Sequence, residues 1–457
     1  MGRHTIRKGL RLPVAGEPDQ VIGPARTARR VALLGDDYVG LRPTMHVSEG
    51  DDVRRGELLF EDKKRPGVRF TSPAAGAVDA IHRGERRSFR SIVIALGRDE
   101  QEGRGGVSVR FSSFSGRHPA GLGGDDVREL LLESGLWPAI RVRPFGRVAD
   151  PHARPRSIFV TAIDTEPLAP RVDVVLEGAH GPFENGLKAL ARMTDGAVYV
   201  CTAPDGRVPV PAGDRFRREE FAGVHPAGAP GLHIHRLDPV NRDRQVWYVG
   251  YQDVVAMGRV FETGELAVER VAALAGPAVS HPRLVRTRLG AAVADVLADE
   301  SLDEAVRVVS GSLLAGRPAS GPAAGYLGRY HRQICLVREG RERELLGWLR
   351  PGLGKFSMSR AFLSTLWRGR RFPFTTTTHG SRRAIVPIGL YERVMPMDLL
   401  PTPLLRALVM HDVERAEELG CLELEEDDLA LCTFVCPSKL DYGAALRRVL
   451  TTLEAEG

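Results

Sequence analysis

Residues 49–60, EGDDVRRGELLF, and residues 71–81, TSPAAGAVDAI, decide the fold of the first part of the chain. Each stretch places turn-forming residues directly before a short apolar strand. An earlier apolar run at residues 31–34, VALL, is closed by Gly35 and two aspartates. Because glycine accepts the backbone angles of tight turns, this spacing predicts a small β domain of short strands.

The pattern EGDxVxxGxLL followed by SPxxGxV resembles that of biotinyl/lipoyl-type domains, which are flattened β-sandwiches of two similar halves. The resemblance predicts a barrel-sandwich over residues 1–100. Carrier members of that group bear a modified lysine at a hairpin tip, and Lys64 in the run EDKK falls at about that place. The charged flanks and Pro66 favour an ordinary solvated turn, so modification of Lys64 is the minor alternative.

Apolar strands alternate with helical patterns over residues 110–257, which predicts a mainly parallel, Rossmann-like α/β layer. Strands are expected at residues 157–162, 173–176 and 197–201, and helices at residues 125–135 and 183–193. The turn-rich residues 98–118 are expected to separate this layer from the first domain.

The remainder of the chain divides into two further parts, which makes the whole an α+β multidomain protein. Strands expected at 258–274, 285–290 and 307–311, around a short helix at 291–300, predict a β-grasp-like module over residues 258–350. Helical spacing of Leu, Ala and Arg predicts a mainly helical C-terminal domain over residues 356–457. Its helices are expected at residues 399–408, 413–419, 427–435 and 442–456.

Cys432 and Cys436 form the most distinctive local motif, CTFVCP. On a helix, positions i and i+4 share one face, so two thiolates could reach one metal ion, with Cys421 as a third ligand. A zinc or iron–sulfur site normally takes four ligands, and neither a fourth ligand nor a C-x2-C spacing is evident. Buried cysteines without a ligand are therefore favoured, and no metal site is predicted.

Three histidines lie in the Gly/Pro-rich stretch HPAGAPGLHIH, residues 225–235. We expect this stretch to lead into a strand, on which His233 and His235 would face the same way. Two imidazoles could begin a metal site, but carboxylates at a matching spacing are missing. A loop shaped by Gly and Pro for close backbone packing is favoured.

The net charge of +6 is spread unevenly. Residues 1–30 carry seven Lys or Arg against two acids, residues 366–383 carry five Arg and no acid, and residues 411–428 carry nine acids against Arg415. Solvated faces are the ordinary explanation. The alternative is a positive surface that faces anionic lipid headgroups or an acidic partner subunit. Aromatic residues make up only 6% of the chain, which disfavours base stacking and nucleic-acid binding.

Several classes of protein and site are excluded. No run approaches 18 uncharged apolar residues, and the N-terminus lacks the apolar core of a signal peptide. Five cysteines do not make a disulfide framework, which favours the cytoplasm. No nucleotide-binding glycine motif, nucleophile elbow or HExxH motif occurs, so no catalytic residue is predicted.

Longer strings closely resemble the NqrA family of the sodium-translocating NADH:quinone reductases (Na⁺-NQR). These strings are residues 31–78, 133–145, 225–235, 251–266, 275–291, 325–348 and 422–443. They span nearly the whole chain in the family's order, and the chain is identified as a member of that family.

The resemblance implies a place in a six-subunit complex of the bacterial inner membrane that oxidises NADH, reduces ubiquinone and expels Na⁺. An NqrA chain would lie peripherally on the cytoplasmic face, with the other five subunits, chiefly the membrane subunit NqrB, as partners. FAD, FMN and iron–sulfur centres belong to partner subunits. No cofactor is expected in this chain, and ubiquinone is a candidate ligand.

The family is also similar to the flavin-binding subunit of respiratory complex I and to the C subunit of the Rnf complex. The cluster-binding cysteines and the glycine-rich FMN site of those relatives are missing here. We therefore expect this chain to keep their fold but to lack their redox site. Cys432 and Cys436 are interpreted as remnants of a cluster-bearing helical domain.

The leading interpretation is a docking and quinone-linked subunit that caps the membrane subunits, with residues 1–30 and 366–383 as contact surfaces. Two alternatives stay open. One is an electron carrier with a flavin, or with a cluster at Cys421, Cys432 and Cys436. The other is a biotinyl or lipoyl carrier that uses Lys64.

Overall fold

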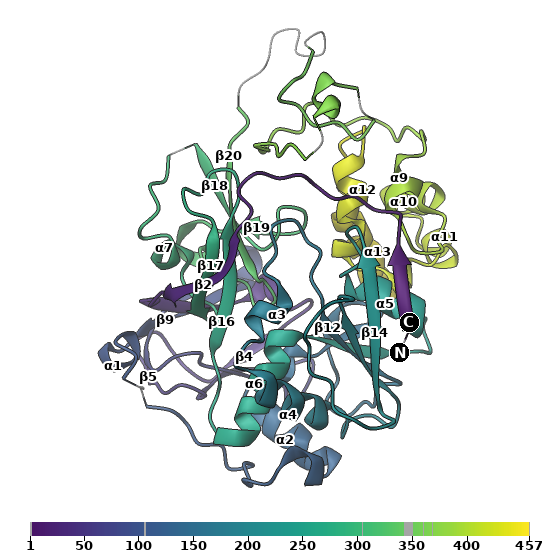
Figure 1. Cartoon of the computed structure of the whole chain (residues 1–457). Coiled ribbons are helices and arrows are strands. Elements are labelled where there is room, and N and C mark those ends of the chain that lie inside the picture. Colours follow the sequence, from purple (N-terminus) through teal and green to yellow (C-terminus); the bar gives the residue numbers. More distant parts are fainter. Residues whose placement is uncertain are drawn as a thin grey trace.

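The computed structural model describes residues 2–104, 107–303, 305–341, 351–359, 361–367 and 369–456. Parts of the sequence predictions lie outside these ranges. They are Met1 of the expected barrel-sandwich, residues 105 and 106 of the expected boundary, residues 304 and 342–350 of the expected 258–350 module, and Arg360, Arg368 and Gly457 of the C-terminal domain. Arg368 also belongs to the basic segment. The described residues form four β-sheets, and the C-terminal helices pack along one side of the molecule (Figure 1).

Two small antiparallel sheets contain the strands that the opening motifs predict. One sheet has the order β3 (Arg30–Leu34), β9 (Phe89–Leu96), β8 (Gly76–Arg83) and β5 (Asp52–Val53), and the other has the order β4 (Pro43–Met45), β6 (Leu58–Asp62) and β7 (Arg69–Thr71). Phe60 and Ile92 from the two sheets belong to one buried core. Gly56 has a φ of +85°, which explains the glycine just before β6. The strands predicted at 31–34 and 58–60 are confirmed. A short helix, α1 (Arg98–Gln101), follows β9.

The central element is a seven-stranded, largely parallel sheet. Its order is β1 (Gly2–Ile6), β14 (Phe216–Gly223), β13 (Val198–Thr202), β12 (Ile158–Ala162), β15 (Val246–Gly250), β10 (Arg141–Arg143) and β11 (Arg147–Val148). The strands predicted at 157–162 and 197–201 are confirmed as β12 and β13.

Both faces of this sheet are buried, which explains why β12 is apolar except for Thr161. Val160, on one face, belongs to a buried core that includes residues of α2 (Gly124–Glu133), α4 (His180–Leu190) and α6 (Tyr251–Thr263). The adjacent Phe159 packs on the other face, against α5 (Pro230–Leu237) and the C-terminal helices. The helices predicted at 125–135 and 183–193 are confirmed as α2 and α4 within a few residues.

A six-stranded sheet follows in the chain. Its order is β19 (Arg317–Pro318), β18 (Val306–Ser310), β20 (Gln333–Arg338), β16 (Glu269–Ala275), β17 (Arg283–Arg288) and β2 (Asp19–Ala25), with the short helices α7 (Val293–Val296) and α8 (Gly321–Ala324) beside it. The strands predicted near 285–290 and 307–311 are confirmed. The helix expected at 291–300 is shorter, because only residues 293–296 form it.

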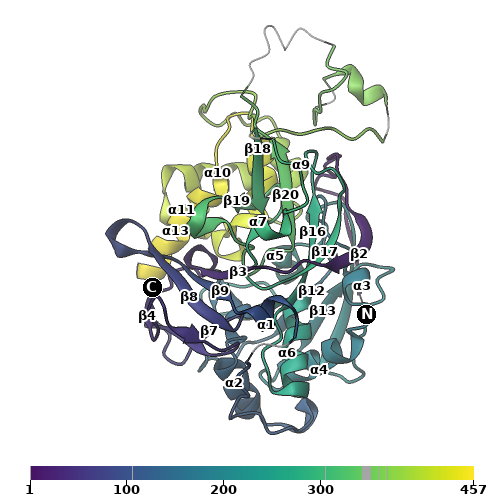
Figure 2. The same ribbon diagram turned by 90° about the vertical axis from the view of Figure 1, so that its left-hand side faces the viewer.

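The first 25 residues contribute one strand to each of two sheets whose other strands come from much later in the chain. Strand β1 lies parallel to β14, and β2 lies parallel to β17. In Figure 2 this purple segment runs beside strands from much later in the chain. The N-terminus therefore ties the seven-stranded and six-stranded sheets together.

The C-terminal residues form the predicted helices. They are α10 (Pro401–Met410), α11 (Val413–Glu418), α12 (Ala430–Val435) and α13 (Tyr442–Glu456). A further short helix, α9 (Leu390–Val394), precedes them and was not predicted. In α13 the buried Tyr442, Leu446, Val449 and Leu453 recur every three to four residues, as expected for one helical face. The helix expected at 427–435 begins as a 3-10 turn, Glu426–Leu429, before α12. Among the described residues, none of the helices is long and apolar enough to cross a membrane.

Three predictions of strand were wrong. Residues 173–176 belong mostly to α3 (Val172–Val175), because an apolar run of only three residues, 174–176, fits a helix as well as a strand. The histidine-rich stretch enters α5 rather than a strand, since Pro230 occupies the first turn of a helix. Residues 258–263 complete α6, which ends at Gly264 with a φ of +72°.

Candidate functional site

The chain order of the seven-stranded sheet creates a switch point between β12 and β15. From β12 the chain continues through β13 and β14 on one side, and it then returns to β15 on the other side. Open α/β sheets commonly bind ligands at such a point, beyond the carboxyl ends of the strands. Here those ends lead into Asp164, Thr165 and Glu166 after β12 and into Tyr251 after β15.

Arg332 lies across this switch point. It comes from the segment just before β20, and its guanidinium pairs with Asp164 at 3.0 Å. The same group lies over the ring of Tyr251, 5.5 Å from its centroid. The Asp164 side chain is almost fully buried, so this pair forms in a poorly solvated place. The Tyr251 hydroxyl is buried and has no hydrogen-bond partner among the described residues.

Glu166 and His225 form the second part of the cluster. Glu166 accepts a hydrogen bond of 2.8 Å from Ser312 and lies 3.7 Å from the His225 Nε2. Burial, with a contribution from Asp164, raises the pKa of Glu166 to about 7. Burial lowers the pKa of His225 to about 4, so the ring is neutral near pH 7. The cluster therefore holds a carboxyl group that can exchange a proton near neutral pH.

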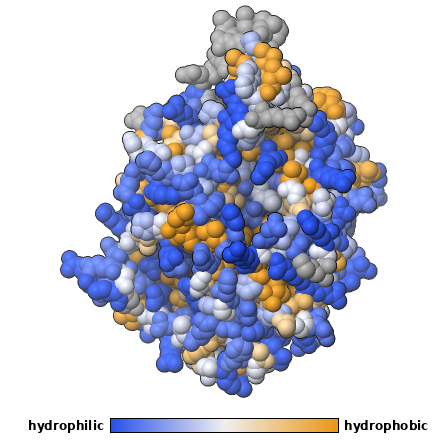
Figure 3. All heavy atoms as spheres, viewed as in Figure 1, coloured by the Kyte–Doolittle hydropathy of each residue, from blue (hydrophilic) through white to orange (hydrophobic). Residues whose placement is uncertain are grey.

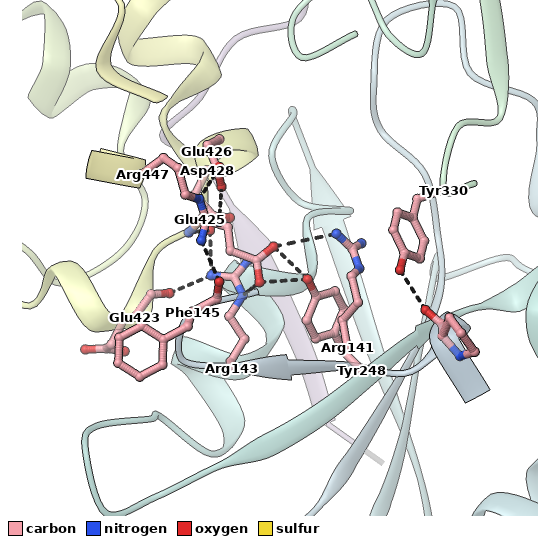
Figure 4. A network of polar contacts seen from close by, with 11 residues as sticks. Arg141, Arg143, Phe145, Tyr248, Tyr330, Glu423, Glu425, Glu426, Asp428 and Arg447 are labelled. Carbon is pink, nitrogen blue, oxygen red and sulfur yellow. Dashed lines mark hydrogen bonds and ion pairs between the residues drawn. The ribbon is translucent and has the colours of Figure 1, made fainter. Parts of the chain in front are cut away.

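A larger polar network joins the sheet to the C-terminal helices (Figure 4). Arg143, at the end of β10, is only 1% exposed and pairs at 2.8 Å with both Glu425 and Asp428. It also donates a hydrogen bond to the Glu423 carbonyl, and the Tyr248 hydroxyl donates to Glu425. Burial alone would lower the pKa of Arg143, but the two carboxylates raise it above its ordinary value. Within the acidic run, Glu425 and Asp428 thus form an internal connection rather than a solvated face, whereas Asp427 is exposed.

Arg141 lies between the rings of two tyrosines, as Figure 4 shows. Its guanidinium is 4.5 Å from the centroid of Tyr248 and 4.2 Å from that of Tyr330, and an ion pair of 3.8 Å reaches Glu425. Its side chain remains 24% exposed. Stacking on two rings fixes the cation while leaving donors accessible, so Arg141 can contribute positive charge beside the switch point.

Comparison with known proteins identifies the family. Three family models match: the NqrA N-terminal barrel-sandwich hybrid domain at residues 4–97, the NqrA second alpha/beta domain at residues 122–266, and the NQRA C-terminal domain at residues 271–321. The A subunit of the Na(+)-translocating NADH-quinone reductase of Klebsiella pneumoniae (strain 342) is 52% identical over 452 residues, covering 99% of both chains. The chain belongs to the NqrA family.

A second NqrA relative, the A subunit of the same reductase from Vibrio alginolyticus, is 49% identical and covers 99% of this chain and 100% of its own. Among solved structures, two of an NAD⁺-reducing [NiFe]-hydrogenase are similar, with 14% sequence identity and TM-scores of 0.35 and 0.39. They cover 50% and 76% of this chain, and 48% and 64% of their own.

The residues singled out in the sequence do not gather in this member of the NqrA family. Lys64 lies exposed in the turn between β6 and β7, as expected for a hairpin tip, and its backbone N–H donates to Asp62. Within the described ranges, no three His, Cys, Asp or Glu side chains are arranged to hold a metal ion. His235 contacts Glu423 through Nδ1 and accepts from the Asp398 N–H through Nε2. His233 is buried, with its Nε2 2.8 Å from the Ala227 carbonyl oxygen.

The cysteine motif has a different geometry from the one expected. Helix α12 ends at Val435, so Cys436 lies beyond it and does not share a helical face with Cys432. The Cys436 thiol instead lies 3.2 Å from the Tyr391 hydroxyl and 3.3 Å from the Tyr442 hydroxyl. Burial raises the pKa of Cys421 and Cys432 to about 12. Burial also raises that of Cys436, but hydrogen bonds from the two tyrosines outweigh it and lower the pKa.

Sequence reasoning missed the switch-point residues. Asp164 and Glu166 directly follow a predicted buried strand, and polar residues at the carboxyl end of such a strand are the signal that could have found them. No local sequence pattern places Arg332 at this site, because Arg332 comes from the segment before β20, which belongs to the six-stranded sheet.

Proposed function

We propose that this chain is the peripheral subunit of a six-subunit bacterial complex that oxidises NADH, reduces ubiquinone to ubiquinol and expels Na⁺. The observation that carries the proposal is 49–52% identity, over 99% of the chain, to relatives named as the A subunit of the Na(+)-translocating NADH-quinone reductase. The chain would lie on the cytoplasmic face of the inner membrane, with the other five subunits, chiefly the membrane subunit NqrB, as partners. Redox cofactors would belong to those partners.

Docking would use the basic N-terminal and 366–383 segments as one surface. Backbone hydrogen bonds join them, from the Ala15 N–H to the Phe372 carbonyl and from the Phe372 N–H to the Pro13 carbonyl. Arg371 also pairs with Glu17. Positive charge collected in one place favours an anionic neighbour, either acidic protein or lipid.

The decisive experiment is affinity purification of the chain from gently solubilised membranes of its own cell. Five co-purifying subunits and sodium-stimulated NADH:quinone reductase activity are expected. Arg370→Glu with Arg371→Glu should lower the yield of complex, whereas Arg406→Glu, an exposed arginine on α10, should not. The sequence prediction also included Arg368, which lies outside the described residues. A lone, inactive chain from intact membranes would contradict the proposal.

The switch-point cluster is the part of the chain that we connect with quinone access. Quinone carbonyl oxygens accept hydrogen bonds, and the unpartnered Tyr251 hydroxyl and Arg332 are donors beside one another. In the assembled complex, Tyr251→Phe should raise the KM for ubiquinone and leave NADH oxidation by an artificial acceptor unchanged. Tyr199→Phe, on β13, is the control.

The two alternatives are tested on the purified chain. In a visible absorption spectrum, flavin bands would support an electron carrier with a flavin in the α/β layer, and iron–sulfur bands would support one with a cluster at Cys421, Cys432 and Cys436. An intact mass above that of the polypeptide by a biotinyl or lipoyl group would support a carrier that uses Lys64. We propose that neither group is present.

The domain ranges also remain proposals. They are residues 1–100 for the barrel-sandwich, 110–257 for a Rossmann-like layer, 258–350 for a β-grasp-like module and 356–457 for the helical domain. Expressing residues 110–257 alone tests this division most directly, because the segment lacks strand β1 of its sheet.

A further inference from the structure

A long segment between β20 and α9 leaves the body of the protein. We call its described residues, 351–359, 361–367 and 369–388, the arm. In Figures 1 and 2 the arm lies at the top of the molecule, and its residues Phe372, Thr376 and Arg383 donate backbone hydrogen bonds to the body at Pro13, Arg338 and Ser438. Its regular structure in the described residues is the single 3-10 turn Leu363–Leu366. Its base is anchored, because Phe374 packs 5.6 Å from Phe356 and 6.1 Å from Phe434, between ring centroids.

The arm carries charge of one sign. From residue 351 to residue 391 the sequence contains no Asp or Glu and seven Lys or Arg, namely Lys355, Arg360, Arg368, Arg370, Arg371, Arg382 and Arg383. Arg370, Arg382 and Arg383 are exposed and have no ion pair among the described residues. A stretch of this kind attracts an anionic surface and repels a cationic one.

Large apolar side chains are exposed on the same arm. Leu366 is 72% exposed and Trp367 is 54% exposed. The described residues include eleven exposed large apolar side chains, and six lie on the arm: Leu353, Leu363, Leu366, Trp367, Val386 and Ile388. Figure 3 shows apolar atoms gathered at this projecting end. This concentration marks an interaction surface, whereas isolated exposed apolar residues are ordinary.

The chemistry of the arm fits lipid better than a protein groove. A groove that binds a helix needs an amphipathic helix with anchors over several turns, and the arm has only a four-residue turn. A lipid leaflet needs no matching shape. It accepts Leu among the acyl chains, Trp at the level of the headgroups and Arg against their phosphates.

We propose that the tip of the arm, Leu363, Leu366 and Trp367, inserts into an anionic lipid leaflet while Arg370, Arg382 and Arg383 bind the headgroups. The inference rests on the proposed function, because that function places a membrane beside this chain. The arm would then hold the chain against the bilayer at the edge of the surface that contacts the membrane subunits.

The purified full-length chain tests this with vesicles of phosphatidylcholine alone or mixed equally with phosphatidylglycerol. We expect sedimentation with the anionic vesicles, weakened by salt, and little with phosphatidylcholine alone. Replacing Arg370, Arg382 and Arg383 with Gln should weaken binding roughly 100-fold, from about fivefold per basic residue. Leu366→Glu with Trp367→Glu should abolish it. Leu400→Glu with Met410→Glu, which change exposed apolar residues outside the arm, should not.

Brominated lipid supplies a second measurement. Quenching of tryptophan fluorescence is measured in a chain that carries Trp348→Phe, because Trp348 lies outside the described residues, whereas Trp137 and Trp247 are fully buried. Quenching is expected in this chain and should fall sharply when Trp367→Phe is added. The proposal is overturned if anionic vesicles do not bind the chain, or if the arm variants bind as the wild type does. Loss of vesicle binding with normal assembly of the complex would point to a protein occupant and sink only the lipid inference. Vesicle binding without assembly would sink only the proposed function.

Discussion

Arg143 lies where the sheet meets the C-terminal helices, and its removal would leave Glu425 and Asp428 buried without their counter-charge. Breaking a buried ion pair by deleting one partner typically costs about 3–5 kcal/mol. We expect Arg143→Ala to lower the free energy of unfolding by that order, as measured by urea denaturation. Arg154→Ala removes an exposed pair with Asp195 and should have little effect. Equal effects of the two variants would contradict this role.

Glu166 should make stability depend on pH in a defined direction. Its pKa is raised to about 7, so the folded state binds more protons than the unfolded state between about pH 4 and pH 7. The contribution of Glu166 to stability is therefore fully present below pH 4 and is lost as pH rises through 7. The free energy of unfolding of Glu166→Gln should exceed that of the wild type by at most about 3 kcal/mol at pH 8 and by little at pH 5.

Thermal unfolding of both proteins across pH 5–8 checks this, with the exposed Glu129→Gln as control. The difference between variant and wild type is the relevant quantity. His225 acts in the opposite direction, since its lowered pKa of about 4 makes stability fall as pH decreases below about 6.5. A gain for Glu166→Gln that is equal at pH 5 and pH 8 would show that the carboxyl does not titrate differently on folding.

At the residue scale, the sequence indicates which side chains could take part in a site, but it does not indicate which residues they contact. Lys64 was correctly expected in a turn, because flanking turn residues are a local signal. The histidines and cysteines were weighed as ligands, yet their actual partners, such as Glu423 for His235 and Tyr391 for Cys436, come from distant elements. The Arg332–Asp164 pair spans two sheets and leaves no trace in the spacing of the sequence.

Helices α4 and α6 approach each other through two glycines. A Cβ at Gly258 would lie 1.7 Å from the Pro182 carbonyl oxygen, and one at Gly186 would lie 2.0 Å from the Val254 carbonyl oxygen. Gly258→Ala must therefore push the helices apart, and we expect a loss of about 1–3 kcal/mol in urea denaturation. Gly181→Ala, also on α4, meets no atom within 4 Å and should be neutral or stabilising by up to ~1 kcal/mol.

The elements with strong periodicity were predictable, and the short ones were not. Helix α13 was found because its long helical spacing is unambiguous. Strands β12 and β13 were found because they are rich in β-branched and aromatic residues, which favour strands. The four-residue helix α3 was taken for a strand, since so short an apolar run has no distinguishable period. Packing against the sheet, which only the whole fold provides, decides such cases.

We expect a protease to cleave the molecule first in the arm, while the rest of the molecule resists digestion. The arm exposes Arg370, Arg382 and Arg383, and exposed irregular segments are cut first. We expect limited trypsin digestion to cleave there first, while the two pieces still elute together in gel filtration. They should stay together because Arg143 binds Glu425 and Asp428, and Arg447 donates a hydrogen bond to the Phe145 carbonyl, which joins the C-terminal piece to the rest of the chain. Early cleavage within the seven-stranded sheet, or separation of the pieces, would contradict this.

At this scale the sequence predicted a barrel-sandwich followed by α/β, β-rich and helical parts. The family models support the barrel-sandwich and the second α/β domain. The sequence did not predict that β1 joins the seven-stranded sheet and β2 joins the six-stranded sheet. The local pattern of residues 2–25 does not indicate which strands they pair with.

Because β1 and β2 pair with strands from much later in the chain, they cannot pair until those strands have been synthesised. Strand β1 is the first element to be synthesised, yet its partner β14 is complete only at Gly223. At about 5–20 residues per second, roughly 10–40 s pass before the partner exists. During this interval the nascent N-terminus offers an unpaired strand that other chains could bind. Arg3 within β1, and Arg7, Lys8 and Arg11 soon after it, keep this part of the chain charged and hydrated until β14 has been made.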